Sequence, residues 1–330
     1  MITASLTRRS LLTGALLMLA GCSSGSSTPD IGTSASTRTV PGGLGTIEVP
    51  AGPQRVVAVG QYRDLDAAIA LGVVPLLSPD LSFFLEGGVA PWVQPLLGPA
   101  KLNLVDVEEM PYEAIAALKP DLILATDRLN LEEEYARLSQ IAPTMSWDEG
   151  YNKDEWRTTT TRVGAALGKE AEAAQQIKTT EDAIAQAKAA NPEFAGKTFT
   201  LGPVTADGTV NTINSTSDAS AEFLAQFGLA LSPAVTSLPN AAIPGRAVIS
   251  PERLDVLDAD VLMLTFNTPA ARTKLEATPL FQQIPAVRRG AYVGLDLPAA
   301  LAIGFPSALS VRYGIEQVLP KIKAALARPR

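Results

Sequence analysis

Residues 112–125 read YEAIAALKPDLILA, and residues 251–264 read PERLDVLDADVLML. Each stretch joins an amphipathic helix pattern to a short apolar run that is typical of a buried parallel strand. The two stretches align without a gap, with Glu113 and Glu252 in second place and an aspartate before each apolar run. This repeat predicts two α/β halves of one design. The alternative is the chance likeness of any two helix–turn–strand units.

The same alternation of short apolar runs and amphipathic stretches fills the chain from Pro41 onward. Such alternation is typical of α/β proteins with mainly parallel sheets. The apolar runs predict strands at residues 56–59, 74–77, 122–125, 144–147, 198–201, 261–264 and 292–295. The amphipathic stretches predict helices at residues 64–71, 111–118, 131–141, 219–227, 251–257 and 307–326. The expected fold is therefore two α/β lobes, at residues 40–152 and 193–330.

Residues 153–192, between the lobes, have a sustained helical composition that ends at Asn191-Pro192. A single helix of this length would span roughly 50 Å at 1.5 Å per residue. This predicts one long helix that connects the two lobes. The alternative is two helices broken at Gly168. Trp156 falls on the apolar phase of the segment, so core packing is its expected role.

Composition restricts the function of the chain. Its 330 residues carry a net charge of −7, with 46% apolar and 18% charged residues, which predicts a globular protein and disfavours a nucleic-acid binder. The sequence contains no histidine, which removes histidine-based acid–base catalysis and the commonest ligand of zinc and haem. The one cysteine, Cys22, excludes an intrachain disulfide and a cysteine metal site. We therefore expect neither a resident cofactor nor a metal held by protein side chains.

The N-terminus has the pattern of an export signal. Arg8 and Arg9 precede an apolar run at residues 11–20. Since a membrane-spanning helix needs about 20 apolar residues, this run predicts a cleaved signal peptide over residues 1–21. The two arginines and the residues around them resemble a twin-arginine export signal, and an ordinary secretory signal is the alternative.

The residues around Cys22 predict a lipid anchor. Residues 19–22 read LAGC, which resembles a bacterial lipobox and implies cleavage before Cys22 and lipidation of its sulfur. Residues 22–39 are rich in Ser, Gly and Thr, which predicts a flexible tether. Because a diacylated cysteine holds a protein on a membrane, we expect the folded part on the extracytoplasmic face of a bacterial cell membrane.

Seven blocks of sequence, in order along the chain, resemble a single family. They are RVVAVG (55–60), ALGVVP (70–75), YEAIAALKPDLILA (112–125), LSQIAPT (138–144), SPERLDVLDADVLML (250–264), FQQIPAVRRGAYVGLD (281–296) and FPSALSVRYGIEQVLP (305–320). Together they resemble the substrate-binding lipoproteins of ABC importers for ferric siderophores, haem and cobalamin. The resemblance implies two α/β lobes joined by one long rigid helix, with the ligand in a shallow cleft between them. It also implies a monomeric, non-enzymatic protein that captures a ferric siderophore and delivers it to an ABC permease dimer for iron uptake.

Candidate ligand-binding residues follow the carboxyl ends of the predicted strands, where ligands meet α/β lobes. They are Tyr62, Arg63, Thr126, Arg128, Trp147 and Tyr151 in the first lobe, and Phe266 and Asn267 in the second. A ferric siderophore supplies its own iron ligands, so the protein needs only aromatic faces and guanidinium groups around the chelate. The two arginines are the leading candidates, and the three aromatic residues of the first lobe are the expected walls. A solvated charge or a salt bridge is the alternative for each arginine.

Glu113 and Glu252 are candidates for a different role. The family resemblance suggests that one acidic residue on each lobe contacts basic residues of the permease dimer, and these two glutamates occupy corresponding places in the repeat. The alternative is that each stabilises its helix by lying near the positive end of the helix dipole.

Other functions stay open at this point. Haem would need an iron ligand such as Tyr62 or Tyr151, because the chain has no histidine. Cobalamin would need mainly apolar and aromatic walls. An enzyme would need a nucleophile and base without histidine, and the sequence shows no such motif. An envelope scaffold or signalling lipoprotein with the same fold and no transport role is the remaining alternative.

Overall fold

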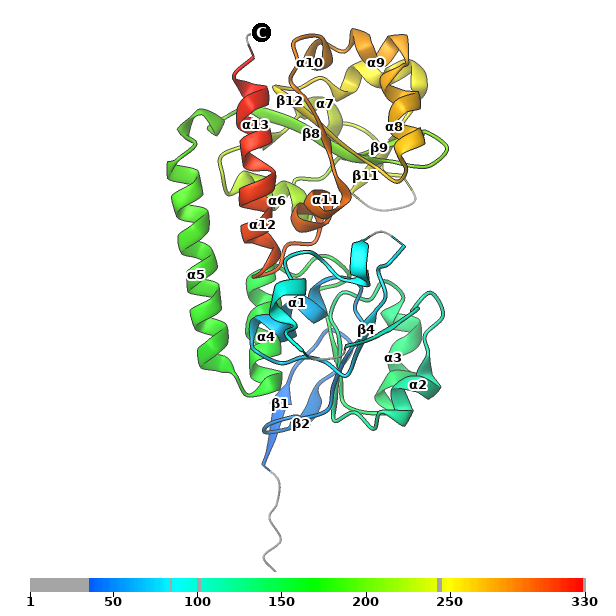
Figure 1. The fold of residues 1–330 in the computed structure, drawn as a ribbon, viewed down its shortest axis with the longest axis vertical. Helices are drawn as coiled ribbons and strands as arrows, with labels where there is room; N and C mark the ends of the chain where they lie inside the picture. The colour runs from blue at the N-terminus through cyan, green and yellow to red at the C-terminus, as the bar shows by residue number, and fades with distance from the viewer. Residues whose placement is uncertain (1–35, 84, 100–101, 242–244, 329–330) are drawn as a thin grey trace, which may run out of the picture. The chain divides into compact units, whose positions relative to one another are not determined.

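The computed structural model describes residues 36–83, 85–99, 102–241 and 245–328. Within this part the chain forms an N-terminal lobe, two helices that lead out of it, and a C-terminal lobe (Figure 1). The predicted signal peptide over residues 1–21, the candidate lipidation site Cys22 and most of the predicted tether lie outside the described residues. No helix in the described part is long and apolar enough to cross a membrane.

The N-terminal lobe is built on short parallel strands. Its central sheet has the order β3-β6-β7, and β4 pairs with β5 in a second parallel pair. The bounds are β3 Val56–Ala58, β4 Leu77–Pro79, β5 Asn103–Val105, β6 Leu122–Ala125 and β7 Thr144–Ser146. The helices are α1 Arg63–Ala70, α2 Tyr112–Ala117 and α3 Leu131–Ser139, with short 3-10 turns η1 Glu86–Gly88 and η2 Gln94–Leu96. Along β6, Leu122 and Leu124 pack toward α1, whereas Ile123 and Ala125 pack toward α2 and α3, so both faces of the sheet are buried.

The predicted tether ends earlier than residue 39. Strand β1, Thr37–Val40, pairs antiparallel with β2, Ile47–Pro50. Val40 and Val49 are buried in the core of the lobe, so the last residues of the predicted tether are held by a sheet. The tether over residues 22–39 is therefore wrong at its C-terminal end.

The C-terminal lobe has one larger sheet, in the order β11-β9-β8-β12-β13, with β10 also paired to β8. The bounds are β8 Thr198–Val204, β9 Val210–Ile213, β10 Ala230–Leu231, β11 Arg246–Ile249, β12 Val261–Phe266 and β13 Tyr292–Leu295. Strands β8, β10, β12 and β13 are parallel, and β9 runs antiparallel to β8 and β11. The prediction of two α/β lobes with mainly parallel sheets is confirmed.

Helices cover both faces of the larger sheet. They are α6 Ala219–Ala225, α7 Pro233–Thr236, α8 Pro269–Glu276, α9 Pro279–Gln283, α10 Pro285–Arg288, α11 Leu297–Gly304, α12 Ser310–Gln317 and α13 Leu319–Leu326, with 3-10 turns η3 Pro192–Phe194 and η4 Pro251–Leu257. Val261 and Met263 of β12 pack toward α6, α11, α12 and α13, and Leu262 and Leu264 pack toward η4 and α8 to α10. The predicted terminal helix over residues 307–326 is two helices, because Pro320 is in the first turn of α13, where its ring cannot continue the helix before it.

The predicted helix over residues 153–192 is also two helices, α4 Trp156–Leu167 and α5 Glu170–Ala189. Gly168 takes the left-handed conformation, with φ +69, and ends α4. The alternative break at this glycine is therefore the right one, and the connecting helix is α5 alone (Figure 1). Ala173 of α5 packs in the core of the N-terminal lobe, whereas Ile184 packs in the core of the C-terminal lobe. Trp156 is 3% exposed and lies in the C-terminal core, as its apolar phase predicts.

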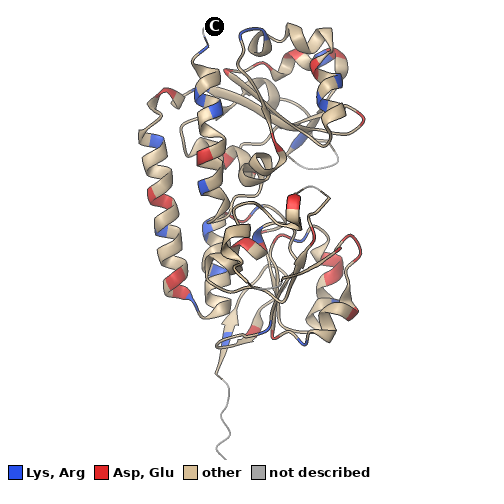
Figure 2. Cartoon of the chain, in the orientation of Figure 1, with Lys and Arg blue, Asp and Glu red and all other residues tan. Residues whose placement is uncertain are grey.

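A further apolar cluster joins the two lobes. Leu65 and Ile69 of α1 and Val93 pack with Leu301 of α11, and Phe305 lies at its margin. Lys and Arg are interspersed with Asp and Glu over both lobes (Figure 2). The lobes of the described part are thus tied together by α5 and by this shared cluster.

Candidate ligand-binding site

The turn between β3 and α1 is held by two buried carboxylates. Asp127 accepts hydrogen bonds from the backbone N–H groups of Tyr62 (2.7 Å) and Arg63 (2.9 Å), and Asp64 accepts one from Gly60 (2.9 Å). Position 60 admits only glycine, since a Cβ there would lie 1.9 Å from Asp127 Oδ1. Burial raises the pKa of Asp64, with the Asp127 carboxylate adding to the rise, and burial raises the pKa of Asp127 although Arg63 opposes it. The turn that carries Tyr62 is therefore held in place by hydrogen bonds to these buried carboxylates.

Arg63 lies inside the N-terminal lobe. It is 2% exposed, and its guanidinium donates to the backbone oxygen of Asp154 (2.8 Å) and to the side chain of Asn152. Burial lowers its pKa, while the carboxylates of Asp127 and Asp154 act in the opposite direction. These contacts tie α1 to the loop that precedes α4. Its Nη1 and Nη2 groups thus serve the loop, whereas its buried Nε has no hydrogen-bond partner among the described residues. Arg63 is therefore not an open guanidinium in this structure, and its contact with a ligand stays a prediction.

Arg128 and Thr126, which follow β6, are buried as well. Arg128 is 5% exposed and forms two hydrogen bonds of 2.7 Å with the carboxylate of Glu134. Thr126 donates its hydroxyl to Asp64 at 2.5 Å. The salt-bridge alternative is thus correct for Arg128. Neither side chain is presented to a ligand.

Trp147 is also part of the core. It is 8% exposed, and a Cβ on Gly43 would lie 2.4 Å from its ring, so the chain passes directly over it. The residue after β7 therefore packs inward and is not a wall of a cleft. The sequence around Trp147 does not indicate this burial, because the residue that covers its ring, Gly43, is distant in sequence.

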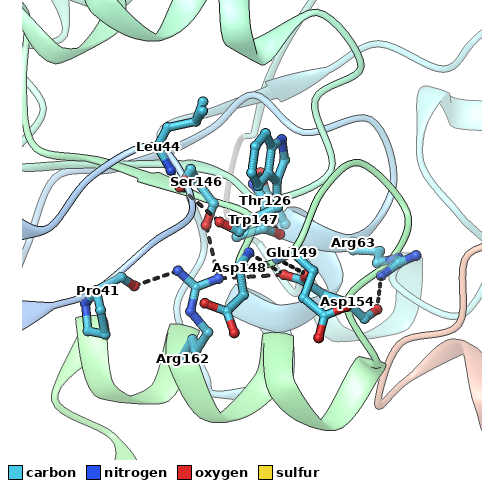
Figure 3. A network of polar contacts seen from close by, with 11 residues as sticks. Pro41, Leu44, Arg63, Thr126, Ser146, Trp147, Asp148, Glu149, Asp154 and Arg162 are labelled. Atoms are coloured by element: carbon cyan, nitrogen blue, oxygen red, sulfur yellow. Dashed lines mark hydrogen bonds and ion pairs between the residues drawn. The ribbon is translucent and has the colours of Figure 1, made fainter.

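The loop that follows Trp147 is organised by Asp154 and Arg162 (Figure 3). The Asp154 carboxylate accepts hydrogen bonds from the backbone N–H groups of Asp148 (2.7 Å) and Glu149 (2.8 Å). Arg162 donates to the backbone oxygens of Ser146 (3.0 Å) and Pro41 (2.6 Å) and lies 3.5 Å from the Asp154 carboxylate. This network fixes the loop and leaves the Asp148 and Glu149 side chains exposed.

Tyr62 and Tyr151 lie where the N-terminal lobe meets the C-terminal lobe. The centroid of the Tyr62 ring is 4.3 Å from that of Phe305 in the other lobe. Burial and the Asp127 carboxylate raise the pKa of Tyr62 to about 12. Burial and Asp127 also raise the pKa of Tyr151, and Arg246 of the C-terminal lobe acts to lower it. Tyr151 is therefore within electrostatic reach of both lobes.

Arg246 is the cation that the C-terminal lobe brings to this boundary. It begins β11 and pairs with Asp218, which caps α6 by accepting a hydrogen bond from Ser220 N–H at 2.9 Å. Its side chain is 23% exposed.

Phe266 and Asn267 lie at the end of β12, as predicted. Phe266 packs at the margin of the C-terminal core, with the Arg272 guanidinium 5.8 Å from its ring centroid. Asn267 is exposed, and its backbone N–H donates to Val204 O. Within the part of the chain that the structure describes, no recorded contact joins either residue to Tyr62 or Tyr151, so their role in binding stays a prediction.

We use the term inter-lobe surface for Tyr62, residues 148–155, Asp218, Glu222 and Arg246. A hollow of about 420 Å³ lies beside it, lined by Trp156 and Arg157 from the start of α4 and by Glu222 and Gln226 from α6 and the turn after it. Burial raises the pKa of Glu222, and the carboxylates of Glu155, Asp218 and Glu149 add to the rise. The two lobes therefore face one another across tyrosines, carboxylates and one paired arginine.

A second contact between the lobes was not predicted from the sequence. Ser307 donates its hydroxyl to Asp66 Oδ2 at 2.5 Å, and the indole N–H of Trp92 donates to the same oxygen at 2.7 Å. Burial raises the pKa of Asp66 to about 7. Asp66 falls within the predicted helix 64–71, but its partners are 26 and 241 residues away.

Glu113 and Glu252 lie on separate lobes and both are exposed. Glu113 is in α2 and lies 3.1 Å from Arg137, whereas Glu252 is in η4. The helix of the repeat is thus an α-helix in one lobe and a 3-10 helix in the other. Contact of these glutamates with a permease stays a prediction.

Comparison with known proteins identifies the fold. A family model described as "Periplasmic binding protein" matches residues 88–298, which run from the N-terminal lobe through α5 into the C-terminal lobe. The chain belongs to this family. This periplasmic binding protein is 28% identical over 296 residues to the Fe(3+)-citrate-binding protein YfmC of Bacillus subtilis, a match that covers 87% of this chain and 88% of YfmC.

Two solved structures are similar to this periplasmic binding protein over both lobes. One is a periplasmic solute-binding protein of Mycobacterium smegmatis, with 32% identity, a TM-score of 0.74, and 88% of this chain and 99% of that chain covered. The other is PiaA of Streptococcus pneumoniae in complex with ferrichrome, with 27% identity, a TM-score of 0.74, and 88% and 99% covered. The family resemblance predicted from the seven sequence blocks is confirmed.

A metal ion held by His, Cys, Asp or Glu would need several of these side chains close together. Among the described residues, no three of the His, Cys, Asp and Glu side chains are arranged to hold one. That the ligand brings its own iron, and that the protein has no resident cofactor, stays a prediction.

Proposed function

We propose that this protein captures a ferric siderophore outside the cytoplasmic membrane and delivers it to an ABC permease for iron uptake. The observation that carries the proposal is the family match, which spans both lobes and the connecting helix. PiaA, an iron-uptake ABC transporter substrate-binding protein, is similar over 88% of this chain and is solved with ferrichrome. YfmC, similar over 87% of the chain, binds ferric citrate by its name.

The chemistry of the inter-lobe surface supports this function. A ferric siderophore encloses its iron in its own oxygen ligands, so the protein contacts only the organic periphery of the chelate. Tyr62 and Tyr151 supply aromatic faces and hydroxyl groups for such contacts, and Arg246 supplies a guanidinium from the other lobe. The role is binding, and the described chain needs no catalytic group for it.

The anchoring and docking residues complete the proposal. Lipidation of Cys22, after cleavage of residues 1–21, would hold the protein at the extracytoplasmic face of the membrane. Glu113 and Glu252, one exposed on each lobe, would pair with basic residues of a permease dimer. Substitution of both glutamates by arginine should abolish uptake and leave chelate affinity unchanged, because neither lies at the inter-lobe surface.

Isothermal titration with ferrichrome, ferric citrate, haem and cobalamin tests the binding function. We expect saturable binding of a ferric chelate, and weakening of about fivefold or more in Tyr151→Ala, since an aromatic contact contributes about 1 kcal/mol or more. Tyr112→Ala is the matched control, because Tyr112 lies on α2, away from the inter-lobe surface. Saturable binding of haem or cobalamin alone, or of none of the four, would contradict the proposal.

A further inference from the structure

The charges at the inter-lobe surface are mostly negative. Glu155 of the N-terminal side and Glu222 of the C-terminal lobe line the same hollow of about 420 Å³. Burial raises the pKa of Glu222, and the carboxylates of Glu155, Asp218 and Glu149 add to the rise, so four carboxylates from both lobes act on one another here. Glu149, Glu155 and Glu222 are exposed to solvent. A ligand that enters between the lobes therefore meets carboxylates.

The arginines near this surface already have partners. Arg246 binds Asp218, and Arg157 lies 2.6 Å from Glu181 and 3.6 Å from Glu155. Arg63 and Arg162 donate to backbone oxygens inside the N-terminal lobe. Within the described ranges, Lys153 alone of the cations on this surface is exposed without a salt-bridge partner.

Ferric chelates differ in charge by their donor groups. A hydroxamate carries one negative charge and a catecholate carries two, against three positive charges of ferric iron. A tris-hydroxamate chelate is therefore neutral, a hydroxamate chelate with a free amine is cationic, and a tris-catecholate carries three negative charges. Ferric citrate is anionic because its carboxylates exceed the charge of the metal. A protein that binds a trianion needs several unpaired cations, since like charges at a contact disfavour binding.

We propose that the inter-lobe surface selects ferric chelates of zero or positive net charge, which are the hydroxamates, over anionic citrate and catecholate chelates. This inference rests on the proposed function and names the ligand class of the same site. The tyrosines at the boundary suit a neutral organic periphery, and the four carboxylates repel an anionic one. One unpaired lysine does not offset that repulsion.

Competition binding to the purified protein, at about 50 mM salt, tests this selectivity. The probes are ferrichrome (neutral), ferrioxamine B (cationic), ferric citrate and ferric bacillibactin (trianionic). We expect the two hydroxamates to bind at least about tenfold more tightly than either anionic chelate. We also expect the ratio of the hydroxamate affinity to the anionic-chelate affinity to fall at about 500 mM salt, because salt screens repulsion between exposed charges.

Two variants move the selectivity in opposite directions. Glu222→Gln removes one repelling charge, so the ratio of the ferrichrome to the bacillibactin affinity should fall several-fold. Arg246→Gln leaves the Asp218 carboxylate unpaired, so the same ratio should rise. The matched control is Glu132→Gln, an exposed glutamate of α3, which should leave the ratio unchanged.

The outcomes distinguish a failure of this inference from a failure of the proposed function on which it rests. Tighter binding of ferric citrate or bacillibactin than of both hydroxamates overturns the charge selectivity and leaves siderophore capture standing. An unchanged ratio in both Glu222→Gln and Arg246→Gln also overturns it. Binding of none of the four chelates overturns the proposed function and this inference together.

Discussion

The contact between Asp66 and Ser307 makes the stability of the two-lobe structure depend on pH. Asp66 is 2% exposed, and burial raises its pKa from 3.8 to about 7. Since one pKa unit corresponds to about 1.4 kcal/mol, ionised Asp66 costs the folded state up to about 4 kcal/mol. The hydrogen bonds from Trp92 and Ser307 offset part of the burial cost and are already included in that pKa.

The sign follows from the direction of the pKa change. Below about pH 4, Asp66 is protonated in both the folded and the unfolded chain and adds no pH dependence. Between about pH 4 and 7 it is protonated only in the folded chain, so each rise in pH lowers the free energy of unfolding. Above about pH 7 it is ionised in both states and the loss is complete. Asp66 therefore destabilises the protein at alkaline pH.

Asp66→Asn should remove this dependence, because a neutral amide oxygen still accepts hydrogen bonds from Trp92 and Ser307. Urea unfolding followed by circular dichroism, from about pH 5 to about pH 8, measures the difference between wild type and variant. We expect the stability of the variant relative to wild type to rise by about 3 kcal/mol over this range, because about two of the three units of pKa change lie between pH 5 and 8. The buried carboxylates of Asp64 and Asp127 give wild type a pH dependence of the same sign, but they are present in both proteins and largely cancel in the difference.

Ser307→Ala provides a second, independent test of the contact between Ser307 and Asp66. Loss of the Ser307 donor should raise the pKa of Asp66 further, so this variant should lose more stability at about pH 8 than at about pH 5. In the Asp66→Asn background the effect of Ser307→Ala should no longer vary with pH. A stability difference between wild type and Asp66→Asn that stays constant across the pH range would refute the reasoning.

Two further substitutions test the corrections to the sequence analysis. Gly168→Ala should destabilise the protein by about 1 to 2 kcal/mol or more, because φ is +69 and a Cβ would lie 2.5 Å from Ala51 O; an unchanged melting temperature would argue against the break at this residue. Arg128→Met should cost about 3 kcal/mol in urea unfolding by leaving Glu134 unpaired, with most of the loss recovered in Arg128→Met/Glu134→Leu. If Arg128→Met instead kept its stability and lost chelate binding, the role predicted from the sequence would be correct after all.

The lobes were predictable from the sequence because their signal is local. Leu122 to Ala125 form an unbroken apolar run, and a strand buried on both faces by helices requires such a run. The repeat between residues 112–125 and 251–264 also holds at the level of strands β6 and β12. Its helices differ, since α2 is an α-helix and η4 is a 3-10 helix, because apolar spacing over six or seven residues does not separate the two.

The site was less predictable because its contacts are distant in sequence. The positions after β3, β6 and β7 are where an α/β lobe brings side chains to one edge, and the prediction was right about that place. It could not tell which side chains turn inward. Arg63 is held by a loop 89 to 91 residues away and Trp147 is covered by Gly43, whereas Arg128 is held by Glu134, only six residues along. The pair Arg128–Glu134 could have been predicted from the sequence, since the turn into α3 brings these two residues together.

The two lobes are joined rigidly. We therefore expect the side chains already present at the inter-lobe surface, and not a closing motion of the lobes, to decide which chelate binds. Helix α5 is anchored in both cores by Ala173 and Ile184, and Leu65 and Leu301 share an apolar cluster. Any large opening would expose that cluster and break the hydrogen bond from Ser307 to the buried Asp66 carboxylate. Large hinge motions are therefore opposed by several contacts at once, and scattering curves with and without ligand should nearly coincide. With the lobes held in place, a chelate must fit the charges that already face it, which is why the paired state of Arg246 bears directly on selectivity.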